Sequence, residues 1–426
     1  MSSFRSRQRS QAGRHFIRPA AEHEASKPEA PAERRAPVQR EAAARPPREL
    51  DLFAPCPRGL EGVLARELAA LGAERVETAD GGVGFVGDMT LMMRANLELR
   101  TASRVLLRLA HGRYRDERDI YALALNVDWP RWFDVSRTIK VKTDGHGSGL
   151  RSLDFVSLKV KDAVCDRFRR AQDARPSVDT RYPDVRIHVY LDAEWATVYL
   201  DTSGEPLFKR GWRDETGEAP LRENLAAGVL LLAGYDGSQP LLDPMMGSGT
   251  LLIEAADIAL NRAPGRLREF GFTELRSYDA VAWEGVRARA RQAEKPVAPL
   301  PIHGSDRAVQ MLVKTRHNLG RVGLAGAVTL AQRDVLDARP FAESGLIVCN
   351  PPYGVRLDEQ DALAELYPQL GSWLKQHFAG WTANFFTGDL RMPKLMRLTP
   401  ARKIPLYNGA LDCRLFVLPM VAGSNR

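Results

Sequence analysis

The chain has 426 residues, of which 44% are hydrophobic and 27% charged, and this indicates a globular protein of two or three domains. No apolar run approaches the roughly 20 residues that cross a bilayer, and the N-terminus lacks the apolar segment of a secretory signal, so we expect a cytoplasmic protein with no membrane anchor. The four cysteines form no CxxC pair, and no His stands at zinc-ligand spacing, so we predict reduced thiols and no metal.

Most of the net charge of +8 belongs to residues 1–48, which hold 11 Lys and Arg residues against 5 Asp and Glu residues. This segment is rich in Arg, Ala, Pro and Glu and has few large apolar side chains. Because it cannot bury enough apolar surface to offset its ordering entropy, we expect a disordered basic tail. At most it would form a weak, salt-sensitive contact with RNA.

Residues 51–205 are expected to form a compact α+β unit. A short strand and turn lead into a helix with Leu60, Leu64 and Leu68 on one face, and Asp80-Gly81-Gly82 marks the turn before a further strand. "MTLMMRANLELRTASRVLLRLA" has the pattern of a helix followed by a strand. "IKVKT" then leads into another helix, and "VRIHVYLD" and "ATVYLDTSG" alternate as two strands joined by a short turn.

Residues 206–426 are predicted to form a second, α/β domain. A basic, aromatic connector precedes a helix with Leu221, Leu225, Val229 and Leu232 aligned on one face. Apolar strands at "PLLD", "PIHGSD", "AVTLAQRD", "GLIVCNPPY" and "TANFFTGD" then alternate with helical patterns, which indicates a mostly parallel, doubly wound sheet. The last two strands flank an Asn408-Gly409 turn, so we expect one reversed strand at the end.

A glycine-rich turn follows the first strand of this domain, in "LLDPMMGSGTLLIEAA". Glycines there allow positive φ and close approach of a ligand to the backbone. The turn lacks the lysine of a P-loop and the third glycine of GxGxxG. The residues that we expect to bind a cofactor here are Asp243, Pro244, Met245, Gly247, Ser248, Gly249 and Thr250.

Two further acidic residues, Asp306 and Asp334, end the next two strands. A dinucleotide fold places its acid about 20 residues after the glycines, and Asp306 lies much farther along, so NAD is disfavoured. Three acids at successive strand ends suit an ammonium group, a ribose diol and an adenine amino group, all of which S-adenosyl-L-methionine carries. Taken singly, Asp306 and Asp334 could instead be helix caps.

The strand "LIVC" is followed by Asn350, Pro351, Pro352 and Tyr353. The prolines force an extended exit and remove two backbone donors, so carbonyl acceptors remain beside the Asn350 amide. Such acceptors suit a planar NH2 group, and Tyr353 offers a face on which a base can stack. We therefore predict that these four residues receive an aromatic amine for methylation, with neither a metal nor a general base required. A Pro-rich turn with a core tyrosine is the alternative.

In "DPMMGSGTLLIEAA", "GSD", "QRDV" and "NPPYGVRL", the chain resembles the THUMP-containing class I methyltransferases that modify guanine N2 in RNA. It is most similar to the methyltransferase half of the bacterial 23S rRNA enzymes. The resemblance implies a seven-stranded, Rossmann-like methyltransferase sheet, and a ferredoxin-like plus THUMP fold for residues 51–205. Some relatives carry a second methyltransferase for 7-methylguanine, and we expect that activity to be absent from this chain.

The same resemblance implies an RNA partner, most simply 23S rRNA or a large-subunit precursor. Alternative substrates are a tRNA guanine, DNA adenine or a protein glutamine, and a further alternative is a non-catalytic RNA-binding assembly factor. Because the target amine is inaccessible within a helix, we expect a flipped or looped guanine. The phosphate contacts that we predict lie in the connector, at Lys209, Arg210, Trp212, Arg213 and Arg222; secondary candidates are Lys140, Lys142, Lys159 and Lys161.

Overall fold

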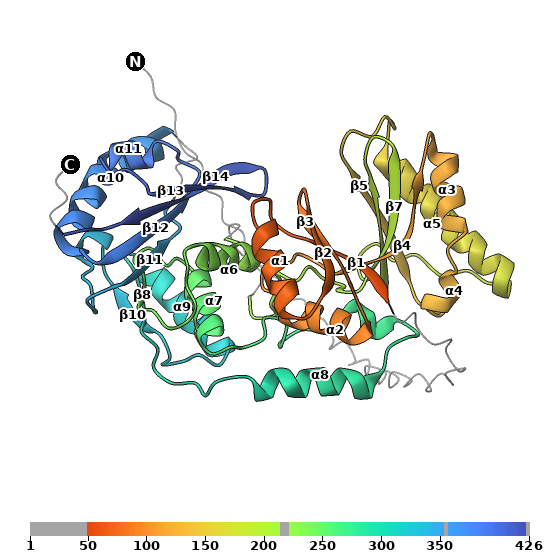
Figure 1. Ribbon diagram of the computed structural model, residues 1–426, viewed down its shortest axis with the longest axis horizontal. Helices are drawn as coiled ribbons and strands as arrows, with labels where there is room; N and C mark the ends of the chain where they lie inside the picture. The colour runs from red at the N-terminus through yellow and green to blue at the C-terminus, as the bar shows by residue number, and fades with distance from the viewer. Residues whose placement is uncertain (1–48, 214–220, 353–356, 423–426) are drawn as a thin grey trace, which may run out of the picture. The chain divides into compact units, whose positions relative to one another are not determined.

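The computed structural model describes residues 49–213, 221–352 and 357–422, and these form two seven-stranded sheets with helices packed against them (Figure 1). The predicted basic tail, residues 1–48, lies outside the described residues. Among the helices that are described, none is long and apolar enough to cross a membrane.

The first sheet has the strand order β2-β3-β1-β4-β7-β6-β5. Neighbouring strands are antiparallel except for β5 and β6, which are parallel. The expected α+β architecture is therefore confirmed. Its strands are β1 (Leu50–Pro55), β2 (Glu74–Ala79), β3 (Gly82–Gly87), β4 (Leu106–Arg113), β5 (Ile139–Gly145), β6 (Val185–Leu191) and β7 (Trp195–Asp201). Its helices are α1 (Glu61–Ala70), α2 (Met89–Glu98), α3 (Glu117–Leu125), α4 (Trp129–Trp132) and α5 (Leu153–Gln172).

The second sheet has the strand order β10-β9-β8-β11-β12-β14-β13. The first five strands in this order are parallel, and β14 runs antiparallel to both of its neighbours, which confirms the reversed strand. The strands are β8 (Leu241–Asp243), β9 (Ile302–Asp306), β10 (Thr329–Gln332), β11 (Gly345–Cys349), β12 (Trp381–Thr387), β13 (Arg402–Asn408) and β14 (Leu411–Pro419). The helices in this part of the chain are α6 (Glu223–Leu232), α7 (Thr250–Ala259), η1 (Gly271–Glu274), α8 (Ala280–Gln292), α9 (Val309–Arg321), η2 (Val335–Asp337), α10 (Leu357–His377) and α11 (Met392–Leu395). Of these, α8 packs against α2 and η1 contacts β6 of the first sheet.

Strand β11 is apolar throughout because both faces of the second sheet are covered. Successive side chains of a strand point to opposite faces. Val348 accordingly joins the larger hydrophobic core, and Ile347 and Cys349 join a smaller core that also contains Leu374 of α10. The continuous run of apolar residues in "LIVC" thus follows from burial on two sides.

The larger core is continuous between the two sheets. It contains Leu60 and Leu64 of α1 together with Leu406 of β13 and Leu415 of β14. At Gly59, which has a φ of +92°, an added Cβ would clash with the backbone carbonyl of Pro405. The α1 region and the β13–β14 hairpin therefore meet in direct backbone contact.

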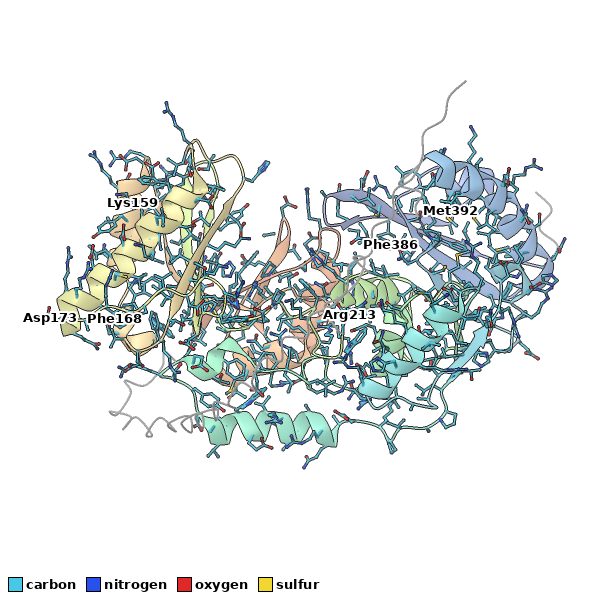
Figure 2. All side chains as sticks on the ribbon, turned by 180° about the vertical axis from the view of Figure 1, so that it is seen from behind. Lys159, Phe168, Asp173, Arg213, Phe386 and Met392 are labelled. Carbon is cyan, nitrogen blue, oxygen red and sulfur yellow. The ribbon has the colours of Figure 1, made fainter. Side chains whose placement is uncertain are left out.

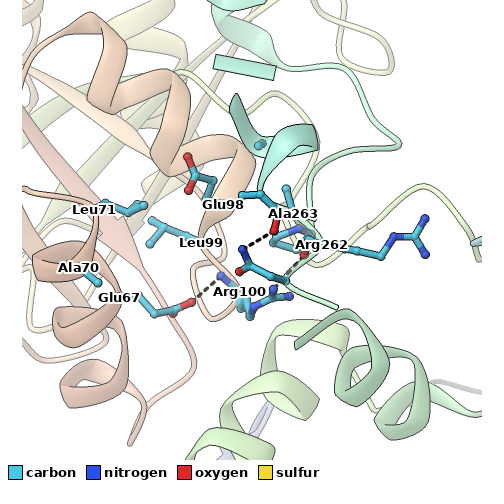
Figure 3. A pocket seen from close by; sticks show the side chains of 12 residues that line it. Glu67, Ala70, Leu71, Glu98, Leu99, Arg100, Arg262 and Ala263 are labelled. Carbon is cyan, nitrogen blue, oxygen red and sulfur yellow. Dashed lines mark hydrogen bonds between the residues drawn. The ribbon is translucent and has the colours of Figure 1, made fainter. Parts of the chain in front are cut away.

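A partly buried polar network accompanies this core, and Figure 3 shows Glu67, Arg100 and Arg262 within it. The Arg100 backbone N–H donates to Glu67 at 2.8 Å, and its Nη2 donates to the Arg262 carbonyl at 2.9 Å. Arg210 Nη2 donates to the Arg100 carbonyl at 2.6 Å, while its Nε contacts Glu254 Oε1 at 3.1 Å. Arg100 thereby connects Glu67 of α1 to Arg210 of the connector, which in turn pairs with Glu254 of α7.

Candidate functional site

The sequence places a tight turn, here called the glycine loop (residues 244–249), between β8 and α7. Gly247 and Gly249 adopt φ values of +52° and +81°, a region that L side chains rarely enter. The loop is closed by the Gly249 N–H, which donates to the Met246 carbonyl at 2.8 Å. A Cβ added at Gly247 would meet no atom within 4 Å, so the loop leaves open space where a ligand can approach the backbone.

Asp243 ends β8 directly before this loop, and its side chain is buried. Its Oδ1 accepts the Met245 N–H at 3.2 Å. Burial raises the pKa of Asp243 to about 8, and the negative charge of Asp306 adds to the rise. The buried Asp243 carboxyl group accepts one described hydrogen bond, so a cationic partner would stabilise its ionised form.

Asp306 connects the end of β9 to the glycine loop. Its Oδ2 accepts the Gly247 N–H at 3.1 Å, and its Oδ1 accepts the Ala308 N–H at 2.9 Å. Asp334 is joined to a different turn, since its Oδ1 accepts the Leu336 N–H at 3.0 Å and caps η2. Each acid thus accepts a backbone N–H from the turn that follows it, as a helix-capping residue does. Of the two, only Asp306 has a described hydrogen bond to the glycine loop.

Helix α9 supports the glycine loop through two buried polar side chains that sequence reasoning missed. Thr315 Oγ1 donates to the Gly247 carbonyl at 2.8 Å, and Asn318 Nδ2 donates to the Ser248 carbonyl at 3.0 Å. The two residues are three positions apart, so they share one face of the helix. The signal in the sequence that could have identified them was a pair of uncharged polar residues on the inward face of α9.

Arg213 joins the connector to the same loop (Figure 2). Its Nε contacts Glu223 Oε1 at 2.8 Å, Nη1 donates to Ser248 Oγ at 3.2 Å, and Nη2 donates to Thr250 Oγ1 at 2.7 Å. The guanidinium also lies 4.6 Å from the Trp212 ring centroid. Arg213 was predicted as a phosphate contact, and in this structure it holds the hydroxyls that follow the glycines.

Asn350 lies at the same edge of the sheet. Strand β11 is parallel to β8, with Ile347 opposite Leu242, so the chain leaves β11 beside the end of β8 that carries Asp243. Asn350 is half-buried, Pro351 is buried and Pro352 is exposed. Tyr353 lies outside the described residues.

Two buried side chains adjoin this exit: Cys349, a free thiol as expected from the sequence, and Asn384, which sequence reasoning missed. Cys349 is fully buried and burial raises the pKa of its thiol, so it is an inert core residue. Asn384 of β12 is also buried, and its Nδ2 donates to the Ile347 carbonyl at 3.2 Å. That bond ties β12 to the strand that ends at the Asn-Pro-Pro sequence.

Two of the predicted RNA contacts require correction. Arg210 is only 4% exposed and pairs with Glu254, and Trp212 is only 2% exposed. Both side chains are core residues, so they cannot form the predicted contacts with a surface phosphate. Lys209 and Arg222 are exposed.

The secondary lysines lie on the first sheet and α5, where each has a local contact. Lys140 Nζ donates to the Thr180 carbonyl at 2.9 Å, and Lys142 pairs with Asp144 at 2.9 Å. Lys161 pairs with its neighbour Asp162, and Lys159 lies 5.2 Å from the Phe155 ring centroid. Nothing in their geometry distinguishes them from ordinary surface charges.

Family models match three consecutive stretches of the chain. Residues 51–106 match the RlmL ferredoxin-like domain, residues 114–201 the THUMP domain, and residues 210–416 the RMKL-like methyltransferase domain. The glycine loop, Asp306, Asp334 and Asn350 all fall within the third match.

One curated relative is the ribosomal RNA large subunit methyltransferase K/L of Methylococcus capsulatus, which is 40% identical over 378 residues. That alignment covers 87% of this chain and 51% of the relative, so the chain spans about half of the relative's length. Among solved structures, the methyltransferase SMU.472 in complex with SAH is 29% identical, with a TM-score of 0.81 and coverage of 88% of this chain and 99% of that one. A methylase from Clostridium difficile 630 is 30% identical, also with a TM-score of 0.81, and covers 89% of this chain and 100% of its own.

Proposed function

Because this chain belongs to the RMKL-like methyltransferase family, with RlmL ferredoxin-like and THUMP domains before its catalytic domain, we propose that it methylates the exocyclic N2 of a guanine in 23S rRNA. The observation that carries the proposal is one sheet edge that combines buried Asp243, an open glycine loop and the Asn350 exit. The RNA substrate is supported by the THUMP match and by the name of the curated relative.

The methyl donor is S-adenosyl-L-methionine, whose sulfonium supplies an electrophilic methyl group. The residues fit it, since buried Asp243 lacks a cationic partner among its described contacts and Gly247 faces open space. Asp243 would hold the ammonium group, Asp306 the ribose hydroxyls and Asp334 the adenine amino group. Pro244, Met245, Ser248 and Thr250 would complete the wall around it.

Asn350 is proposed to receive the guanine amino group. A purine NH2 is a weak nucleophile because its lone pair is delocalised into the ring. The Asn350 side-chain oxygen and neighbouring carbonyls would accept its hydrogens, return electron density to the nitrogen and fix its direction. Tyr353 is proposed to stack on the base, and the displaced proton leaves to solvent.

The proposal is tested by incubating purified protein with labelled S-adenosylmethionine and 23S rRNA that lacks the modification. Label should appear in 2-methylguanine after digestion of the RNA to nucleosides. Transfer RNA, adenine-rich DNA and a protein extract serve as parallel substrates. Label on tRNA alone, on adenine or on protein would each replace the assigned substrate, and absence of transfer to any of them would contradict an enzymatic role.

The role of Asn350 has its own test. Asn350→Ala should reduce kcat at least about 100-fold, as expected when a positioned polar group that acts on the reacting atom is lost. SAH binding, measured by calorimetry, should remain unchanged. Asn126→Ala, at an exposed residue that follows α3, is the matched control. Turnover that survives Asn350→Ala would remove the amide from the mechanism.

A further inference from the structure

A large cavity opens beside the connector, here called the basic cavity. Its volume is about 1070 Å³, above the roughly 300–1,000 Å³ of typical small-molecule sites. It is lined by four segments that are far apart in the sequence: residues within 181–186, 205–213, 221–223 and 268–269. The turn before β6, the connector, the start of α6 and the chain before η1 therefore share one concave surface.

The lining of the basic cavity is strongly cationic. Seven of its residues are Arg or Lys and three are Glu. Some of these charges have internal partners: Arg186 and Lys209 both pair with Glu205, and Arg213 pairs with Glu223. The exposed Arg181 and Arg222 have no ion pair within 4 Å with a described residue, and the charged residues that line the cavity carry more positive than negative charge.

Two aromatic rings line the same surface. Tyr182 is 78% exposed, which is unusual for so large a ring, and its turn is fixed by Asp179, which accepts the N–H groups of Arg181 at 2.8 Å and Tyr182 at 2.9 Å. Phe208 lies beneath Arg222, whose guanidinium carbon is 4.9 Å from the ring centroid. An exposed aromatic ring beside arginines, here Tyr182, is the combination that binds unpaired bases and their phosphates.

The cavity wall is held in place by Arg268. Its Nη1 donates to the Pro206 carbonyl at 2.5 Å and its Nη2 to the Ser203 carbonyl at 3.0 Å. Burial lowers the pKa of Arg268 to about 10, so it remains charged at neutral pH beneath the connector. The connector thus presents its side chains from a fixed backbone.

The basic cavity also adjoins the methyl-transfer edge. Arg213 and Glu223 line it, and the same Arg213 guanidinium contacts Ser248 and Thr250 at the glycine loop. A strand lying in the cavity would therefore lead toward the cofactor loop.

We propose that the basic cavity binds a single-stranded segment of the substrate RNA, with a base stacked on Tyr182 and phosphates at Arg181 and Arg222. This inference rests on the proposed RNA function and extends it, because Arg181 and Tyr182 belong to the THUMP match while Arg222 belongs to the methyltransferase match. The two matched regions then hold one RNA strand jointly, next to the reaction site.

The test measures binding of a short fluorescein-labelled single-stranded RNA by fluorescence anisotropy over a range of salt concentrations. Tyr182→Ala should weaken binding roughly 5- to 150-fold, the effect of losing one base–aromatic stack, without changing the salt dependence. Arg181→Ala and Arg222→Ala should each weaken binding and reduce the slope of log K against log salt by about 0.7. Matched controls are Tyr190→Ala on β6 and Arg289→Ala on α8, both exposed and outside the cavity lining.

Three outcomes would overturn the inference: cavity variants that bind like the controls, a duplex RNA that binds as tightly as the single strand, or displacement of the RNA by polyglutamate at equal charge concentration. Failure of the proposed function is seen separately, because it concerns methyl transfer by the wild-type protein. Loss of RNA affinity in Tyr182→Ala with unchanged SAH affinity supports the cavity even if the methylated base proves to be another one.

Discussion

Burial withholds water from Asp243, and the neighbouring Asp306 repels a negative charge there, so the free protein keeps this carboxyl group protonated up to a pH of about 8. A cationic ligand requires the ionised form. If Asp243 holds the ammonium group of the cofactor, as proposed, then binding at neutral pH releases a proton from Asp243. In the unliganded protein the raised pKa of Asp243 favours the folded state at a pH below about 3.8, the ordinary pKa of an aspartate. This contribution to stability is lost as the pH rises through about 8.

The proton release gives a direct prediction. The affinity for SAH should rise up to about tenfold per pH unit between pH 6 and 8 and then level off, since only ionised Asp243 binds the ammonium group. Calorimetry in two buffers of different ionisation enthalpy should detect the released proton. Asp243→Asn should bind weakly with no such pH dependence, whereas Asp80→Asn, at an exposed position, should retain the wild-type profile. A wild-type affinity that does not vary with pH would contradict the assigned role.

Arg213 gives a second prediction at the scale of one residue. Arg213→Met removes the charge-assisted bonds to Ser248 and Thr250, each worth roughly 1.5–3 kcal/mol, so SAH affinity should fall at least about tenfold. Single-stranded RNA should still bind to within a few-fold of wild type, because the phosphate contacts are proposed at other arginines. Arg289→Met serves as the control, and an unchanged SAH affinity in Arg213→Met would show that the loop keeps its shape without this contact.

At the scale of elements, the β8–α7 turn depends on its packing against α9. A Cβ added at Gly249 would lie 2.6 Å from Thr315 Cγ2, and the φ of +81° costs a non-glycine residue roughly 1–2 kcal/mol. Gly249→Ala should therefore lower the denaturation midpoint and abolish SAH binding. Thr315→Ser, which removes the methyl group and keeps the hydroxyl that donates to the Gly247 carbonyl, should restore part of the lost stability in the double variant.

Gly285 of α8 supplies the matched control for this substitution. It lies in a helix, and a Cβ there would meet no atom within 4 Å. Gly285→Ala should stabilise the protein by roughly 0.5–1 kcal/mol, since alanine loses less backbone entropy than glycine. Equal effects of the two glycine substitutions would mean that the packing against α9 does not matter.

Elements with periodic apolar residues could be predicted, and those without them could not. Helix α1 and the β13–β14 hairpin follow from leucine spacing and the Asn408-Gly409 turn. Strand β2 was missed because all but one of its side chains are exposed, so no alternation marks it. Helix α8 lies in a charged insertion and buries only Trp283 and Val286. Such elements owe their formation to their neighbours in the fold.

Some residues of the candidate site could likewise be predicted from the sequence, and others could not. The glycine loop and Asp243 could be predicted because a turn between strand and helix needs local residue types. Thr315 and Asn318 could not, since their role depends on how α9 packs against the loop. For Arg210 and Trp212 a basic, aromatic stretch predicted surface contacts, and the fold buries both side chains. A basic residue in a sequence does not by itself show whether the folded interior holds an acidic partner for it.

At the scale of the whole molecule, the Arg210–Glu254 pair lies in the interior where the connector meets α7 and the chain after α2. Arg210→Met would leave Glu254 buried without its partner, so we expect a loss of about 3–5 kcal/mol in unfolding free energy. The double variant Arg210→Met/Glu254→Leu should recover most of this loss, because two apolar side chains need no compensating charge. Urea denaturation followed by fluorescence measures both.

The exposed Arg291–Glu284 pair on α8 is the control for that experiment. Arg291→Met should change the unfolding free energy by no more than about 1 kcal/mol, as surface ion pairs contribute little. If Arg210→Met were as mild as this control, the buried pair could not contribute importantly to the stability of the interior.

The direct contact between Gly59 and Pro405 bears on how the protein is made. A ribosome adds roughly 5–20 residues per second, so the α1 region leaves the exit tunnel tens of seconds before the β13–β14 hairpin is synthesised. During that interval Leu60 and Leu64 lack part of their final apolar surroundings. The nascent chain must therefore carry an uncovered apolar face through most of its own translation, and holdase chaperones would find their binding site there.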